Sequence, residues 1–180
     1  MEDIIGNSFL KKWGGDKQVA GDHTECGREE IEVHDIKFVG LYFAAHWCPA
    51  SWNFTWILSE FYNEINLIDT KVFEVIYVPF DKPDEFDESY EEMPWMSLSP
   101  DDDRIKTLKT RYKVTGIPYL VILDTETGKP VSIRGRQEVQ GLKDLEAFTI
   151  WKNRKEEGVF SYDIQNHPIS HHTTDEAKEG

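Results

Sequence analysis

The sequence has few cysteines and no long apolar run. Its 180 residues include two cysteines, too few for the disulfide framework of a small secreted domain. No apolar run approaches the ~20 residues of a membrane-spanning helix, and the first twenty residues lack the apolar core of a signal peptide. We therefore expect a chain of the cytoplasm or nucleus, with no membrane partner.

Basic residues are also scarce. The chain has 20 Lys and Arg against 34 Asp and Glu, for a net charge of −14. An acidic surface disfavours binding to nucleic acids and to anionic lipids. With 39% hydrophobic residues, the chain can bury the core of one domain. No internal repeat is evident.

One segment combines a strand pattern, a cysteine and a helix pattern. The apolar run Phe38–Phe43 is typical of a strand buried on both faces. After Cys48, apolar residues recur at helical spacing, at Phe54, Ile57, Leu58, Phe61, Tyr62 and Ile65. Cys48 therefore stands where a strand ends and a helix begins, and Pro49 suits the first helical position.

This position favours a reactive thiol. The first turn of a helix has unpaired N–H groups and a partial positive charge, which stabilise a thiolate. The pKa of Cys48 is therefore expected below the ~8.5 of a free cysteine. The alternative is an inert cysteine packed in the core.

Further patterns predict a βαβ unit and a second half of the sheet. Strands are expected at 72–78, 119–124 and 131–134, with shorter ones in a hairpin at 7–20 and at 30–34. A helix is expected from Asp101–Asp103 to Tyr112, with the acids at its N-terminus, and a last helix ends near Lys155. The acidic segment 81–88 does not match a calcium loop, so no metal site is expected.

Three motifs resemble the nucleoredoxins and tryparedoxins, a branch of the thioredoxin superfamily. They are Val39–Pro49, which contains Trp47-Cys48-Pro49, then Met93-Pro94-Trp95, and Gly116-Ile117-Pro118. The resemblance implies an α/β thioredoxin fold, a central mixed β-sheet flanked by helices, with an N-terminal β-hairpin extension. The resemblance covers about Asn7 to Trp151. We expect one thioredoxin-like domain at 1–155, followed by a polar, flexible tail at 156–180. Gly135–Val139 resembles the end of the last hairpin in nucleoredoxins.

The resemblance also implies the parts of a redox site. Cys48 would be the nucleophile, and Ser51 stands where the family has its second cysteine. Pro118 would be cis and face Cys48, leaving backbone groups of Ile117 free to pair with an extended substrate. Trp47, Pro49 and Trp95 would complete the substrate-binding surface. For Trp95, a hydrophobic plug between a helix and a loop is an equal alternative.

The site departs from the family at three positions: Ala50, Ser51 and Trp52 replace a proline, a cysteine and a basic residue. We therefore predict a protein-disulfide reductase type of thiol oxidoreductase that acts through Cys48 alone, with no cofactor. Its partners would be disulfide-bonded or glutathionylated client proteins and an external thiol such as glutathione. One alternative is a redox-inactive binding or adaptor module.

A second alternative is a conventional dithiol reductase in which Ser51 replaces a natural cysteine. The neighbouring departures at Ala50 and Trp52 favour natural divergence. Cys26 lies in a polar loop, where it is either an incidental thiol or a distant resolving cysteine for Cys48.

Overall fold

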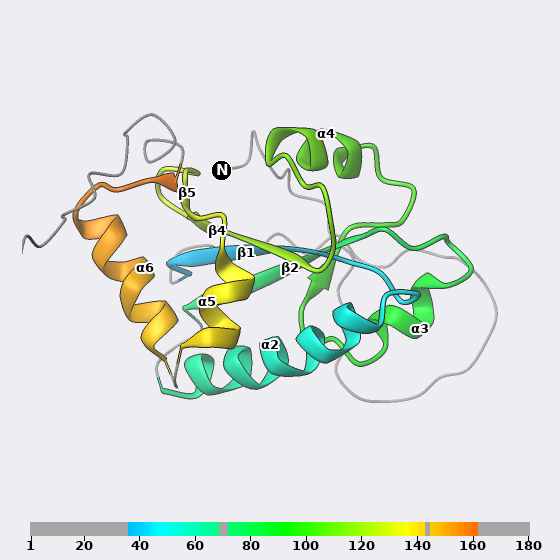
Figure 1. The fold of residues 1–180 in the computed structure, drawn as a ribbon, viewed down its shortest axis with the longest axis horizontal. Helices are drawn as coiled ribbons and strands as arrows, with labels where there is room; N and C mark the ends of the chain where they lie inside the picture. The colour runs from blue at the N-terminus through cyan, green and yellow to red at the C-terminus, as the bar shows by residue number, and fades with distance from the viewer. Residues whose placement is uncertain (1–35, 69–71, 143–144, 162–180) are drawn as a thin grey trace, which may run out of the picture.

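The computed structural model describes residues 36–68, 72–142 and 145–161 (Figure 1). The strands are β1 Phe38–Ala44, β2 Phe73–Pro79, β3 Met96–Ser97, β4 Tyr119–Asp124 and β5 Pro130–Ser132. The helices are α2 Pro49–Ile68, α3 Phe86–Tyr90, α4 Arg104–Arg111, α5 Gly135–Gly141 and α6 Glu146–Glu156. The expected hairpin at 7–20, the expected strand at 30–34 and Cys26 lie outside the described residues.

The strands form one five-stranded sheet in the order β3-β2-β1-β4-β5. β1 pairs parallel with β2 and antiparallel with β4, while β2 and β3 are parallel and β4 and β5 antiparallel. This confirms the predicted mixed sheet. The apolar run at the start of the site is its central strand, and all seven residues of β1 are buried.

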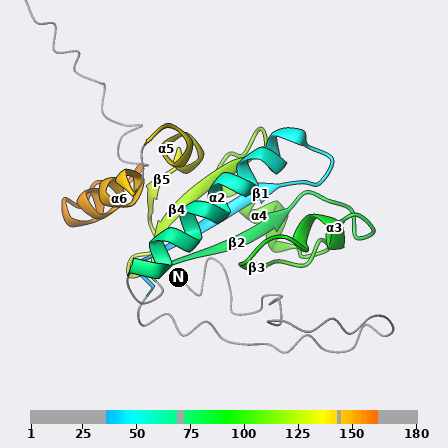
Figure 2. The ribbon, with the colours of Figure 1, turned by 90° about the horizontal axis from the view of Figure 1, so that it is seen from below.

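The two faces of the sheet are covered unequally. Alternate residues of β1 point to opposite faces: Phe38 and Tyr42 join one apolar cluster, Val39 and Leu41 the other. Helices α2, α3, α5 and α6 contribute to the first cluster, whereas Leu108 of α4 belongs to the second. In Figures 1 and 2, α4 lies on the side of the sheet opposite α2.

Helix α2 follows the predicted pattern. Pro49 is its first residue, where the missing N–H has no intrahelical role. Phe54 and Leu58 are fully buried, and Phe61, Tyr62 and Ile65 belong to the same cluster. The apolar face fixes α2 against the sheet, and its first turn therefore lies at the end of β1.

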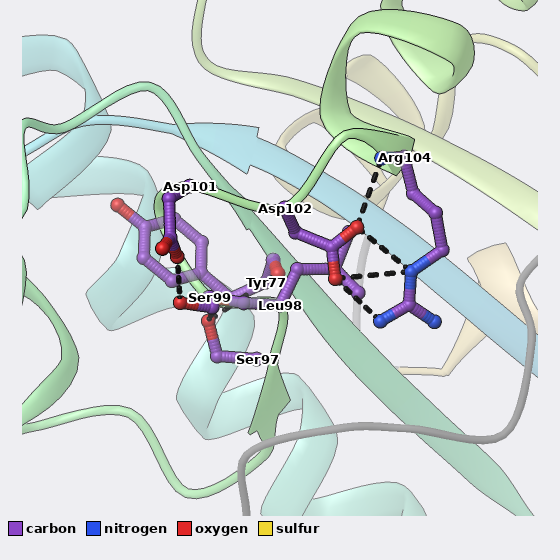
Figure 3. Close-up of polar contacts among 7 residues, drawn as sticks. All are labelled: Tyr77, Ser97, Leu98, Ser99, Asp101, Asp102 and Arg104. Carbon is purple, nitrogen blue, oxygen red and sulfur yellow. Dashed lines mark hydrogen bonds and ion pairs between the residues drawn. The ribbon is translucent and has the colours of Figure 1, made fainter. Parts of the chain in front are cut away.

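The start of α4 is stabilised by one of the three expected acids. Asp103 is the N-cap residue but makes no side-chain cap hydrogen bond. Instead, Asp102 accepts from the Arg104 N–H at 2.8 Å and from its guanidinium at 2.6 to 3.0 Å (Figure 3). Hydrogen bonding to Arg104 therefore lowers the pKa of Asp102. The two-residue strand β3 just before it was not predicted, and it places Ser97 beside Tyr77.

The segment after β5 differs from expectation. Residues 135–141 form the helix α5, not the end of a hairpin. A side chain on Gly135 would place its Cβ 2.9 Å from the Leu120 carbonyl oxygen, so glycine lets α5 begin directly against β4. Glu138 of α5 then accepts from Trp151 Nε1 at 2.8 Å and from Arg154 at 2.7 Å, which joins α5 to α6.

The packed part of the chain continues past residue 155. Helix α6 ends at Glu156, and Phe160 beyond it is buried in the cluster that contains Trp151. The Lys129 ammonium lies 5.0 Å from the Phe160 ring. The remainder of the expected tail, from residue 162, lies outside the described residues.

Candidate functional site

Cys48 lies in the turn between β1 and α2. The turn is closed by the Cys48 N–H, which donates to the Ala45 carbonyl at 3.2 Å. The Cys48 carbonyl in turn accepts from Ser51 N–H at 2.9 Å, within the first turn of the helix. The thiol is half-buried. It is therefore neither sealed in the core nor fully exposed.

The loop before β4 faces this thiol. The Ile117–Pro118 peptide bond is cis, as the resemblance implied. The Cys48 Sγ lies 3.9 Å from the Ile117 carbonyl oxygen, within the range of a weak S–H hydrogen bond. Two segments far apart in the sequence therefore meet at the sulfur. Pro118 is buried, and Ile117 is half-buried.

The surroundings of Cys48 favour its ionised form. Partial burial opposes ionisation, but the Ser51 side chain, the N–H groups of Ser51 and Ala50 and the charge of Arg136 outweigh it. The net effect lowers the pKa of Cys48 below the usual cysteine value. This agrees with the expected effect of a helix N-terminus.

Ser51 occupies a confined position beside the sulfur. Its residue surface is 2% exposed, and its hydroxyl has no well-aligned hydrogen-bond partner in the described part of the chain. Its interaction with Cys48 is nevertheless a main cause of the lowered thiol pKa. A thiolate is a better acceptor than a thiol, so the hydroxyl is available to the sulfur when it ionises.

Tyr42 supports the first turn of α2 from below. Its hydroxyl donates to the Ser51 carbonyl at 3.1 Å and lies 2.8 Å from Thr55 Oγ1. Burial raises the pKa of Tyr42 far above the ordinary tyrosine value, so this group stays protonated. Tyr42 therefore holds the backbone of the site and does not exchange protons near neutral pH.

Aromatic side chains form the rim of the site. Trp47 is 59% exposed, and its indole N–H donates to the Phe80 carbonyl at 3.4 Å. Trp52 is also exposed, and its ring lies 4.8 Å from the His46 ring. Pro49 is exposed as well. These side chains lie in the turn before Cys48 and in the first turn of α2, and they expose apolar surface that a protein segment can cover.

Trp95 does not reach this rim. It is 2% exposed and packs edge-on against Tyr42 and Tyr62, with ring centroids 6.0 and 5.7 Å apart. It thus lies beneath the site, next to the tyrosine that supports α2. Its position is that of a core side chain, because no surface of the ring remains for a substrate.

Two polar groups of the site were not foreseen. Arg136, at the start of α5, donates to the Pro118 carbonyl at 3.4 Å and helps to lower the Cys48 pKa. Asp81, at the end of β2, accepts from the His46 N–H and from the Tyr77 hydroxyl. Both come from distant parts of the chain. Arg136 lies in the segment 135–139 that resembles nucleoredoxins, but that resemblance did not indicate a role at the site.

The fold and the site together define a protein of the thioredoxin class, in which the cysteine of the described residues faces a cis-proline loop. Residues 35–129 match the family model described as thioredoxin-like. The chain belongs to this family, and within it to the branch of the nucleoredoxins and tryparedoxins. The predicted family and fold are therefore confirmed.

Individual relatives support this placement. Bovine nucleoredoxin is 38% identical over 134 residues, which cover 72% of this chain and 30% of that protein. Tryparedoxin II from C. fasciculata has a TM-score of 0.66 at 26% identity, over 82% of this chain and 91% of that one. A tryparedoxin II in complex with glutathionylspermidine has a TM-score of 0.56 at 32% identity, over 61% and 76%.

The chain thus spans under a third of the length of the nucleoredoxin it matches. Its relatives place it among thioredoxin-like redox proteins. Within the described residues, no helix is both long and apolar enough to cross a membrane.

Proposed function

We propose that this protein is a thiol oxidoreductase that acts on protein disulfides through Cys48 alone. The observation that carries the proposal is the position of the sulfur. It is half-buried, its pKa is lowered, and it lies 3.9 Å from the carbonyl of the cis-proline loop. An extended client segment that pairs with Ile117 would bring its own sulfur to this thiol.

The first step is attack by the Cys48 thiolate on one sulfur of a client disulfide. A bond forms between Cys48 and that sulfur, and the other client sulfur leaves as a thiolate that takes up a proton. The same step on a glutathionylated client releases either the reduced client or glutathione, according to which sulfur is attacked. Trp47, Pro49, Ile117 and Pro118 form the surface around the attacked bond.

Ser51 cannot complete the cycle as a cysteine would. A hydroxyl does not form a stable bond to sulfur, whereas a well-placed second thiol acts at an effective concentration on the order of 10⁵ M. The mixed disulfide would therefore persist until an external thiol such as glutathione attacks it. Two external thiols are oxidised to one disulfide in each cycle, and the client disulfide is reduced.

A solved relative supports a small thiol in this role. The tryparedoxin II structure that contains glutathionylspermidine is similar in fold and 32% identical. Glutathionylspermidine contains a glutathione moiety, so a related thioredoxin fold accommodates a low-molecular-weight thiol. We infer that glutathione can approach the mixed disulfide at Cys48 in this chain.

The test is reduction of a model protein disulfide with glutathione as electron donor. The chain is compared with Cys48→Ser and Ser51→Cys. Cys48→Ser should abolish the reaction, and Ser51→Cys should accelerate turnover by supplying an internal resolving thiol. An equal rate in the chain and in Cys48→Ser would exclude catalysis by Cys48. If Ser51→Cys turns over no faster than the unaltered chain, the lack of a second cysteine is not what limits turnover.

The exposed tryptophans favour a second candidate function, a binding module that captures clients without turnover. Trp47 and Trp52 are 59% and 57% exposed beside a site whose second cysteine is replaced. In this case Cys48→Ala would leave client binding intact. If Cys48→Ala no longer binds clients, the clients are instead held by a mixed disulfide with Cys48.

A further inference from the structure

A groove lies beside Cys48 on the α4 side of the sheet. It has a volume of about 570 Å³ and is lined by residues from the end of β2, from α4 and from the loop that leads to Ile117. Phe80, Ile105 and Val114 give it apolar surface. An extended segment of a few residues fits a groove of this size and shape.

Two residues that line the groove are neighbours of the reactive sulfur, although Cys48 itself is not among its lining residues. Trp47, the residue before Cys48, forms one wall, and Ile117, whose carbonyl is 3.9 Å from the sulfur, forms another. A client held in a disulfide with Cys48 therefore has chain next to the bonded cysteine that can enter the groove. The occupant we consider is this client segment.

The groove carries positive charge in an acidic protein. Lys106 and Lys109 of α4 line it, and both are exposed. Neither lysine forms an ion pair with another residue that the structure describes. The Lys109 ammonium lies 5.1 Å from the Phe80 ring, above the apolar wall. Two cations that have no ion-pair partner among the described residues, beside apolar surface, suit a segment that carries carboxylates among apolar side chains.

Among the described residues that line the groove, the one acid does not offset these lysines. Asp81 is 7% exposed, and its carboxylate accepts from the His46 N–H and the Tyr77 hydroxyl. It is therefore turned to the protein and held there. At the start of α4, Asp102 is paired with Arg104 at 2.6 Å.

The overall charge of −14 would repel an acidic client at long range. At physiological ionic strength the Debye length is about 8 Å, so charges in the groove act locally while more distant acids are screened. The exposed acids Asp87 and Glu88 belong to α3, which lies on the other side of the sheet from α4 (Figure 1), and the Glu88 carboxylate lies 3.2 Å from His46 Nε2. The exposed acids Asp101 and Asp103 stand directly before α4, so the positive charge of the groove is local to Lys106 and Lys109, further along that helix.

We infer that this groove binds the client segment next to the cysteine attacked by Cys48, and that Lys106 and Lys109 select segments rich in Asp or Glu. The inference rests on the proposed function and adds a substrate class to it. Trp47 and Phe80 contact the apolar side chains of the segment. The two lysines select for a segment with negative charge.

The test uses short peptides in which one cysteine is bonded to thionitrobenzoate. Attack by Cys48 on the peptide sulfur forms the mixed disulfide and releases coloured thionitrobenzoate. This release gives the rate when the chain carries Cys26→Ser, so that Cys48 is its only thiol. Acidic, amide and basic versions of one peptide are compared in the full chain. The double variant Lys106→Gln/Lys109→Gln removes both groove charges, and Lys152→Gln removes an exposed charge from α6 as a control.

The acidic peptide should react about three- to tenfold faster than the basic one, since two exposed charge contacts change affinity by about this factor. The ratio should approach one in the double variant and stay unchanged in Lys152→Gln. Equal rates for all peptides, or a ratio that survives in the double variant, would overturn the inference.

Two further measurements separate this inference from the proposed function. The neutral reagent hydroxyethyl disulfide reports the reactivity of Cys48 without charge selection, so a failure there counts against the proposed function. Binding of labelled cysteine-free peptides to Cys48→Ala reports the groove without chemistry. Preferential binding of the acidic peptide, lost when both lysines are replaced, supports the inference, and its absence contradicts it.

Discussion

Arg136 connects the helix α5 to the cis-proline loop, because its guanidinium donates to the Pro118 carbonyl at 3.4 Å. The same cation helps to lower the pKa of Cys48. One residue thus positions the loop that faces the sulfur and favours the ionised form of that sulfur. It acts on the site through Pro118 and through its charge.

Replacing Arg136 by glutamine should raise the pKa of Cys48. The thiolate fraction near pH 7 would fall, so alkylation by iodoacetamide would slow a few-fold at neutral pH and recover at alkaline pH. A titration of thiolate absorbance at 240 nm, in chains that also carry Cys26→Ser, measures the shift of the Cys48 pKa. Arg136→Lys keeps the charge and should stay closer to the original value. An unchanged titration in Arg136→Gln would show that this charge does not reach the sulfur.

Ser51→Ala should separate stability from reactivity. The variant removes a buried hydroxyl without a well-aligned partner, so we expect stability to rise by about 1 kcal/mol. It also removes an interaction that lowers the pKa of Cys48, so the thiol should ionise at higher pH. Urea unfolding and the pH dependence of alkylation measure the two effects. A destabilised variant would show that the hydroxyl makes a stabilising contact.

Tyr42→Phe should loosen the first turn of α2. The change removes hydrogen bonds to the Ser51 carbonyl and to Thr55, and we expect a loss of about 1–2 kcal/mol. Tyr119→Phe is the matched control, because the Tyr119 hydroxyl makes no hydrogen bond within the described residues. Similar unfolding midpoints for the two variants would contradict the assigned role of Tyr42.

The buried carboxylate of Asp124 should make the free energy of unfolding depend on pH in the acidic range. Burial raises its pKa, but the Lys155 ammonium at 2.8 Å and Thr127 outweigh burial and lower it. Because the folded-state pKa lies below the unfolded one, this contribution is present above about pH 4 and is lost as the pH falls. Urea unfolding between neutral and acidic pH should follow this loss.

Lys155→Gln removes the partner of that carboxylate. It should destabilise the protein by about 1–3 kcal/mol at neutral pH, and it should flatten the acid dependence. The exposed residue Lys152 on the same helix is the control, and Lys152→Gln should change stability by less than about 0.5 kcal/mol. Equal effects of the two changes would mean that Asp124 does not depend on Lys155.

Much of the sheet could be predicted from local patterns. The strands at 38–44 and 119–124 are continuous apolar runs because both of their faces are buried. Strand β3 has two residues, too few to show a period. Helix α5 depends on the contact of Gly135 with β4, which is a tertiary contact and leaves no trace in the local pattern.

The site, like the sheet, has residues that local motifs indicate and residues that only the folded structure reveals. Cys48 and Pro118 lie in short motifs, so the sequence indicated both. Arg136 and Asp81 reach the site because of how the chain folds, and their nearest neighbours in sequence give no sign of it. Trp95 lies in a recognised motif, but the motif did not fix its environment. A tryptophan in such a motif is consistent with either a surface or a core position. Its burial against Tyr42 and Tyr62 decides for the core.

The unequal burial of the tryptophans provides an optical reporter. Trp47 is 59% exposed, whereas Trp95 and Trp151 are 2% and 0% exposed. A water-soluble quencher such as acrylamide reaches an exposed indole and is kept from those in the interior. Subtracting the fluorescence of Trp47→Phe from that of the unaltered chain isolates the emission of this indole, and shielding of that emission would follow occupancy of the neighbouring surface in real time, without any attached dye.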